Sequence, residues 1–127
     1  LKQEMDRLMQ YLNVLKLYAM DFDSRTTFDA VFYGFFHVPP DALTPLYHHL
    51  NTFLKPGGTL LLEGFSKKNL GRGSGGPQNE AMLFTPESIF HLFDDFTTLE
   101  VWEEETVLNE GPFHQGSASV IRGVCTK

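Results

Sequence analysis

Phe28-Asp-Ala-Val-Phe-Tyr-Gly-Phe-Phe-His37 and Thr59-Leu-Leu-Leu-Glu-Gly-Phe65 are the two stretches that decide the fold. Each is a short, nearly continuous apolar run, as expected for a strand that is covered on both faces. Between them, apolar residues recur at helical spacing from Leu43 to Leu54. The order strand, helix, strand predicts a parallel pair with a right-handed crossover, whose functional edge lies beyond the carboxyl ends of the strands.

The ends of the helix between these strands carry recognisable signals. Asp41 or Thr44 can cap its start, with Pro45 in the first turn. The block Pro56-Gly-Gly58 is predicted to end the helix and to turn the chain into the strand that begins at Thr59.

Further segments extend this unit in both directions. The apolar residues of segment 1–12 fall on one stripe of a helix, and residues 14–18 follow as a predicted short strand. Thr85-Pro-Glu87 has the order of a capped helix start. Two strands are predicted after it, over 96–108 and 117–125, and they fit an antiparallel pair. We expect the glutamates 103–105 to interrupt the first of these strands as a solvated stretch.

Composition excludes several classes of function. The 127 residues are 42% hydrophobic and carry a formal net charge of −6, which fits one globular domain and argues against nucleic-acid binding. The single cysteine, Cys125, excludes an internal disulfide, and no signal peptide or membrane-length apolar run is present. His48 and His49 are adjacent and do not share a helix face, so no metal site is expected. We therefore expect a soluble cytoplasmic protein with no membrane partner.

Four of these features together resemble a known family. They are Phe28-Asp29 opening a buried strand, His37 just past its end, the block Leu54-Lys-Pro-Gly-Gly58, and a strand ending in Glu63-Gly64-Phe65. Together they are similar to the second half of a methyltransferase that uses S-adenosylmethionine (SAM). The closer likeness is to small bacterial methyltransferases related to tellurite-resistance methyltransferases. Their later loops resemble Gly75-Gly-Pro77 and the segment from Glu110 to Gly116.

The resemblance implies an α/β fold with a partial Rossmann-like sheet. Parallel central strands, a C-terminal antiparallel strand pair and helices on both faces are expected, with the first strands of the family absent. The chain is then one truncated domain, in which segment 1–27 normally packs on the missing half and segment 28–127 forms the core. The glycine-rich turn that holds SAM in the family has no counterpart here, because no glycine precedes Gly34.

The function implied is methyl transfer from SAM to a small-molecule acceptor, by a chain that is inactive alone. Such a reaction depends largely on aligning the nucleophile, the methyl group and the leaving sulfur, so it needs no demanding set of catalytic side chains. One alternative is a non-catalytic α/β module for binding or dimerisation. Another is an intact small α/β domain of unrelated function.

The resemblance also implies site residues. Asp21 and Phe22 match the family's adenine-binding position, although a different alignment places Tyr18 there and a plain polar turn is another interpretation. Phe36 and His37 fall near the methionine end of SAM or near the acceptor. The expected cofactor-binding set is therefore Asp21, Phe22, Phe36 and His37, and the expected catalytic residues are His37 and His114.

Both histidines, and one glutamate, have a second interpretation. His37 can act as a general base or hydrogen-bond donor, or it can cap the strand end by bonding to backbone. His114 lies in a loop that can reach the mouth of the family's site, or it is incidental in a turn dense in glycine and proline. Glu63 is either a polar contact to substrate or the first exposed residue of its strand.

Gly71 to Gly76 formally satisfies G-x-G-x-x-G, but a dinucleotide fingerprint directly follows a strand and opens a helix. Here the glycines begin six positions after Phe65 and run into Pro77. We expect a mobile loop, which in the resembled family lies over the active-site mouth as a possible lid.

The strand from Phe28 to Phe35 pairs in the complete family fold with a strand that this chain lacks. Its apolar edge should then be exposed, and such edges tend to pair. The sequence predicts a homodimer formed through this edge or by exchange of the N-terminal helix and strand between two chains. Covering of the edge by the chain's own N-terminal segment is the alternative.

Overall fold

The structure, a computed structural model, describes residues 2–3 and 27–127. The elements of the second range are four strands, two α-helices and two short 3-10 helices: β1 (Phe28–Gly34), α2 (Pro40–Asn51), β2 (Leu54–Phe65), the 3-10 helices Lys67–Asn69 and Glu80–Met82, α3 (Pro86–Leu92), β3 (Thr98–Asn109) and β4 (Gln115–Thr126). Residues 2–3, which fall within the predicted helix over 1–12, are helical; the rest of that helix and the predicted strand over 14–18 lie outside the described residues.

The four strands form one mixed sheet in the order β1-β2-β4-β3. β1 and β2 are parallel, and the α2 crossover joins them, which confirms the predicted strand-helix-strand unit. β4 lies between β2 and β3 and runs antiparallel to both. The predicted α/β class, with parallel central strands and a C-terminal antiparallel pair, is therefore confirmed.

The helix starts differ in how well local signals predict them. α3 begins at a capping box, in which Thr85 accepts from the Ser88 N–H and Ser88 accepts from the Thr85 N–H. α2 instead begins at Pro40 with no side-chain cap, so the prediction that Asp41 or Thr44 caps it is wrong. A proline in the first turn lacks only an N–H that has no helical partner there, which makes Pro40 a sufficient start.

The predicted role of Pro56-Gly-Gly58 also needs correction. α2 ends at Asn51, and Leu54 already pairs with Phe28 of β1. The register between the two strands then shifts before Ala30 pairs with Thr59. The Pro-Gly-Gly block is thus an irregularity within β2, with Gly57 at a positive φ of 79°, and not the end of the helix.

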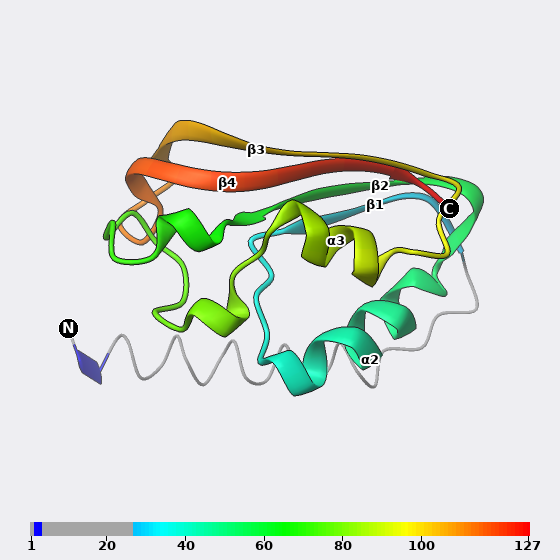
Figure 1. The fold of residues 1–127 in the computed structure, drawn as a ribbon, viewed down its shortest axis with the longest axis horizontal. Helices are drawn as coiled ribbons and strands as arrows, with labels where there is room; N and C mark the ends of the chain where they lie inside the picture. The colour runs from blue at the N-terminus through cyan, green and yellow to red at the C-terminus, as the bar shows by residue number, and fades with distance from the viewer. Residues whose placement is uncertain (1, 4–26) are drawn as a thin grey trace.

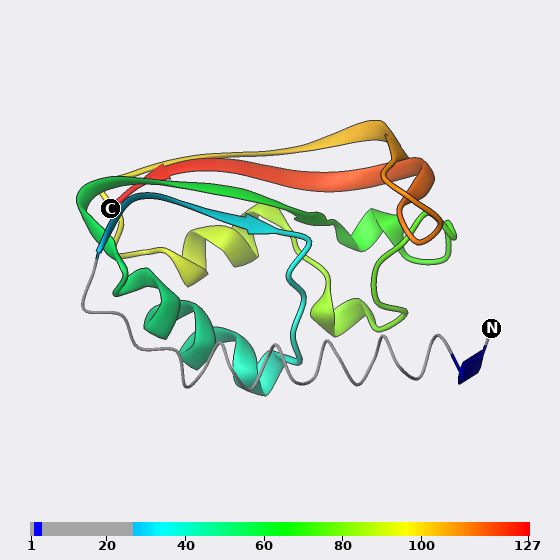
Figure 2. The same ribbon diagram turned by 180° about the vertical axis from the view of Figure 1, so that it is seen from behind.

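One face of the sheet carries the main core. α2 and α3 both lie under this face in the two views of the ribbon (Figures 1 and 2). The core includes Tyr33, Leu60, Ile121 and Cys125 from the strands, with Tyr47 and Phe93 from the helical side. Helices on both faces were expected, but among the described residues both helices cover the same face.

The opposite face is more exposed. The strand register places three apolar residues side by side on adjacent strands: Phe32 of β1, Leu61 of β2 and Val124 of β4. Their exposed fractions are 64%, 42% and 38%. Burying exposed apolar surface of this kind is favourable, so this face can stabilise a contact with another surface.

The glutamates 103–105 do not interrupt β3, which runs continuously from Thr98 to Asn109. Each has a basic partner: Glu103 pairs with Lys68, Glu104 with Arg122, and Glu105 with Arg72. These pairs accommodate three successive carboxylates within one strand.

None of the helices in the described residues is long and apolar enough to cross a membrane.

Candidate functional site

The carboxyl ends of the parallel strands β1 and β2 meet at one end of the sheet, beside the loop that joins β3 to β4 (Figure 1). Four aromatic rings gather there, and we call them the strand-end cluster: Phe35, His37, Phe65 and His114. The Phe35 ring lies 4.7 Å from the His114 ring and 4.8 Å from the Phe65 ring, between centroids. The centroid of the His37 ring lies 5.8 Å from that of the Phe65 ring.

Phe35 has an unusual backbone conformation. Its φ is +50°, and it is the one non-glycine residue with a positive φ in the described part of the chain. Strained backbone of this kind tends to occur at functional sites, since the surrounding structure must hold it in place. Here the Phe35 N–H donates to the Glu63 carbonyl at 2.7 Å, which fixes the turn at the end of β1.

The same turn reverses the expected alternation of side chains. Phe35 packs with Phe65, Val120 and Ala118 on the sheet face without described helices. Phe36 packs instead against the main core, 6.1 Å from the Tyr47 ring. The structure therefore separates the predicted cofactor contact Phe36 from His114 and brings Phe35 to His114 in its place.

His37 is fully engaged with backbone groups. Its Nδ1 lies 2.8 Å from the Met82 carbonyl oxygen and must donate to it, while its Nε2 accepts from the Phe65 N–H at 3.0 Å. This arrangement is the backbone-capping alternative considered from the sequence. With both nitrogens occupied, the ring has no free position for proton transfer.

The surroundings of His37 also favour its neutral form. Burial between the rings of Phe65 and Phe84 lowers the pKa of His37 below its usual value of 6.5, and His114 acts in the same direction. The bond to Met82 opposes this effect without reversing it. The neutral ring is the form that can accept from the Phe65 N–H.

His114 is the more accessible of the two predicted catalytic residues. About a third of its side chain is exposed, at 32%, and its Nδ1 lies 3.8 Å from a Glu110 carboxylate oxygen. Its ring faces Phe65 edge-on at 5.4 Å. His114 therefore combines a fixed position in the strand-end cluster with access to solvent.

The glycine loop is anchored and not free. Asn69, which is 2% exposed, accepts from the Ser119 N–H of β4 and from the Ser74 hydroxyl, and it donates to the Gly75 carbonyl. The Ser74 carbonyl in turn accepts from the Gln115 N–H. The predicted mobile lid is thus pinned to the sheet in its second half, where Gly75 and Gly76 lie against Phe65 and His114.

The remaining predicted residues lie elsewhere. Glu63 accepts from Arg122 at 2.7 Å on the sheet face without described helices, so it is an ion-pair partner and not an unpaired exposed carboxylate. Asp21, Phe22 and the alternative Tyr18 lie outside the described residues. In residues 2–3 and 27–127 no group of His, Cys, Asp and Glu is arranged to hold a metal ion.

Sequence reasoning missed Phe35, because strict alternation along β1 would place it with Tyr33 in the main core. The one hint in the sequence is the preceding Gly34, which is typical of a close backbone approach.

The fold is similar to part of the fold of SAM-dependent methyltransferases, and the chain spans less than two thirds of the length of each structure compared below. Over 86% of this chain, it is similar to TehB from Haemophilus influenzae, with a TM-score of 0.56 and 10% identity. It is also similar to the N-methyltransferase NodS from Bradyrhizobium japonicum, at 0.52 and 12%, and to a SAM-dependent methyltransferase from Methanosarcina mazei, at 0.57 and 18%. The match covers 38%, 57% and 64% of those chains, respectively.

At these identities the similarity establishes the fold, and it confirms the methyltransferase-like architecture predicted from the sequence. No family model matches the sequence, and no curated protein matches it.

Proposed function

We propose that this chain is part of a SAM-dependent methyltransferase that transfers a methyl group to a small-molecule acceptor. The observation that carries the proposal is the sheet itself: the parallel pair β1 and β2, with β4 inserted antiparallel beside β2, follows the fold of methyltransferases over 86% of the chain. Ligands of open α/β sheets bind beyond the carboxyl ends of the strands, which is where the strand-end cluster lies.

The strand-end cluster suits the methionine end of SAM or the acceptor. Aromatic faces attract cations, including the sulfonium class, and the half-buried Phe35 can present such a face beside His114, while the fully buried Phe65 packs behind it. His114, with its exposed edge, is the candidate to contact the acceptor. His37 acts through the backbone: its bonds to Phe65 and Met82 hold the end of β2 and the following loop in place. It is a positioning residue.

SAM should bind these 127 residues very weakly. The polar contacts that the resembled family makes through its glycine-rich turn and ribose carboxylate have no counterpart in the sequence. Each lost polar contact costs about 1 to 3 kcal/mol, so losing several removes micromolar affinity. Isothermal titration calorimetry with SAM should therefore show no saturable heat. A dissociation constant below about 100 µM would contradict this expectation.

The placement of the site can be tested even when binding is weak. In an NMR titration with SAM, the amide signals that move should be those of Phe35, Phe65, Gly76 and His114. Adenosine, which lacks the methionine end, is the matched ligand control and should leave the Phe35 and His114 signals in place. Equal shifts with SAM and adenosine, or shifts confined to the other end of the sheet, would argue against this placement.

A second candidate function is a non-catalytic module that dimerises through β1. The specific observation in its favour is Phe32, which is 64% exposed on a strand that has no partner on its outer side among the described residues. Phe32→Ser should reduce self-association, measured by sedimentation equilibrium. Val107→Ser is the control, because Val107 is 77% exposed on β3 at the far edge of the sheet. A monomeric parent chain would rule out this function.

A further inference from the structure

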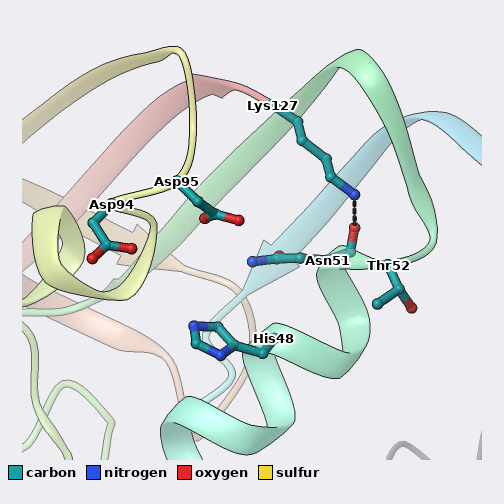
Figure 3. Close-up of a pocket in the computed structure, with 6 residues that line it drawn as sticks. All are labelled: His48, Asn51, Thr52, Asp94, Asp95 and Lys127. Carbon is teal, nitrogen blue, oxygen red and sulfur yellow. Dashed lines mark hydrogen bonds between the residues drawn. The ribbon is translucent and has the colours of Figure 1, made fainter.

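A polar pocket lies at the end of the sheet away from the strand-end cluster. It has a volume of about 240 Å³ and is lined by His48, Asn51 and Thr52 at the end of α2, by Asp94 and Asp95 after α3, and by Lys127 after β4 (Figure 3). This volume is below the range of about 300 to 1,000 Å³ that is usual for drug-sized ligands. The pocket therefore fits only a small molecule.

A buried hydrogen-bond donor points into this pocket. Asn51 is only 5% exposed, and its Oδ1 accepts from the buried Tyr33 hydroxyl at 2.9 Å. Its Nδ2 has no partner within the described residues, and Figure 3 shows it directed between His48 and Asp95. Buried donors without a partner are rare in proteins, so this one calls for an acceptor from outside the described chain.

Two carboxylates stand across the pocket from this donor. Asp94 and Asp95 are exposed, and neither has an ion-pair partner in the described part of the chain. Lys127 forms no ion pair with either carboxylate in the described part of the chain, because its ammonium donates to the Asn51 and Leu54 carbonyls at 2.7 and 2.9 Å, although its positive charge remains at the edge of the pocket. The pocket therefore presents one amide donor beside two carboxylates and one ammonium group, and the excess negative charge favours a cation.

We propose that this pocket binds a small organic cation that carries an oxygen acceptor next to an ammonium group, of the amino-alcohol class. The oxygen accepts from Asn51 Nδ2, and the ammonium donates to Asp94 and Asp95. Both halves are needed, since a simple amine leaves Asn51 without a partner and a neutral alcohol leaves the carboxylates without a counter-charge. This site is separate from the one proposed for SAM and does not depend on it.

The test uses ethanolamine as the probe and follows the Asn51 side-chain amide of the full 127-residue chain by NMR. Ethanolamine should give saturable shifts at Asn51, His48 and Asp95. Ethylamine, which lacks the oxygen, and ethylene glycol, which lacks the ammonium group, should bind about tenfold more weakly, the loss expected for one charge-assisted or buried hydrogen bond.

Variants separate the site from general charge effects. Asp94→Asn with Asp95→Asn should weaken ethanolamine binding by about tenfold or more, because charge-assisted hydrogen bonds are replaced by neutral ones. Asp41→Asn removes an exposed carboxylate from the other end of α2 and should leave binding unchanged. The substituted carboxylates are exposed, so the fold should persist, and the remaining spectrum reports this directly.

Three results would overturn the proposal. The first is the absence of saturable shifts at Asn51, in which case the pocket holds water only. The second is equal binding of the three probes, and the third is unchanged ethanolamine binding in the Asp94→Asn, Asp95→Asn variant.

Discussion

His37 Nε2 accepts a hydrogen bond from the Phe65 backbone N–H at 3.0 Å, which ties the end of β1 to the end of β2. The other ring nitrogen donates to the Met82 carbonyl, so one side chain links three segments that are distant in sequence. The position of the strand-end cluster depends on this link.

Replacing His37 should destabilise the fold. His37→Ala removes both bonds and leaves the Phe65 N–H and the Met82 carbonyl without partners, at a cost of about 1 to 3 kcal/mol for each buried group. We expect the free energy of unfolding in urea to fall by about 2 to 5 kcal/mol, because lost packing adds to the lost bonds. His91→Ala, at an exposed position of α3, is the matched control and should change it by less than about 0.5 kcal/mol. A similar small change in both variants would contradict the role of His37.

Stability should also depend on pH through His37. Its pKa in the folded state lies below the usual value of 6.5, so the unfolded chain takes up a proton more readily than the folded chain. The contribution of His37 is complete above pH 6.5 and is lost as the pH falls toward the lowered folded-state pKa. The urea midpoint of the parent chain should therefore decline as the pH is lowered through this window.

The matched variant for this pH effect is His37→Gln, whose amide oxygen can accept from the Phe65 N–H but does not titrate. The urea midpoint of this variant should fall less than that of the parent chain as the pH is lowered below 6.5. The lowered pKa values of Glu103 and Glu105 act in a separate window, below their usual 4.5. If the urea midpoints of the parent chain and of His37→Gln depended identically on pH above 5, the effect would belong to another group.

Asn69 should be essential for anchoring the glycine loop. Asn69→Ala leaves the Ser119 N–H and the Gly75 carbonyl without partners inside the protein, so a loss of about 2 to 4 kcal/mol in unfolding free energy is expected. Release of the loop should also speed tryptic cleavage after Arg72. Asn109→Ala, at an exposed position of β3, should leave both measurements unchanged, and a similar cleavage rate in the two variants would show that the anchor is unimportant.

Two glycines of this loop should differ sharply in their tolerance of alanine. A Cβ at Gly75 would lie 2.5 Å from the Phe113 carbonyl and 2.8 Å from the Phe65 ring, whereas a Cβ at Gly71 would meet nothing within 4 Å. Both have positive φ, at 132° and 82°. Gly71→Ala should therefore cost only the backbone strain of about 1 to 2 kcal/mol.

Gly75→Ala adds a close contact with rigid backbone, for which overpacking costs about 1 to 3 kcal/mol more. Thermal unfolding followed by circular dichroism compares the two variants directly. Equal midpoints would mean that the loop moves away from Phe65 at no cost.

The sequence by itself determined the strand-helix-strand core. Apolar runs around Val31 and Leu61 and the helical periodicity between them are local patterns, and so is the helix start at Thr85 and Pro86. Local patterns suffice because each depends on residues that are neighbours in the chain or along one element. The same reasoning placed His37 just past the end of β1, whereas His114 was expected near this end of the sheet only from the family resemblance.

Only the tertiary structure decided which side chains meet there. The positive φ of Phe35 moves its ring to the face of His114, and two backbone groups from other segments occupy the nitrogens of His37. The orphan donor of Asn51 likewise arises from packing between α2, Tyr33 and the turn after α3. These features depend on contacts between residues far apart in the chain, and no periodicity within a single segment encodes them.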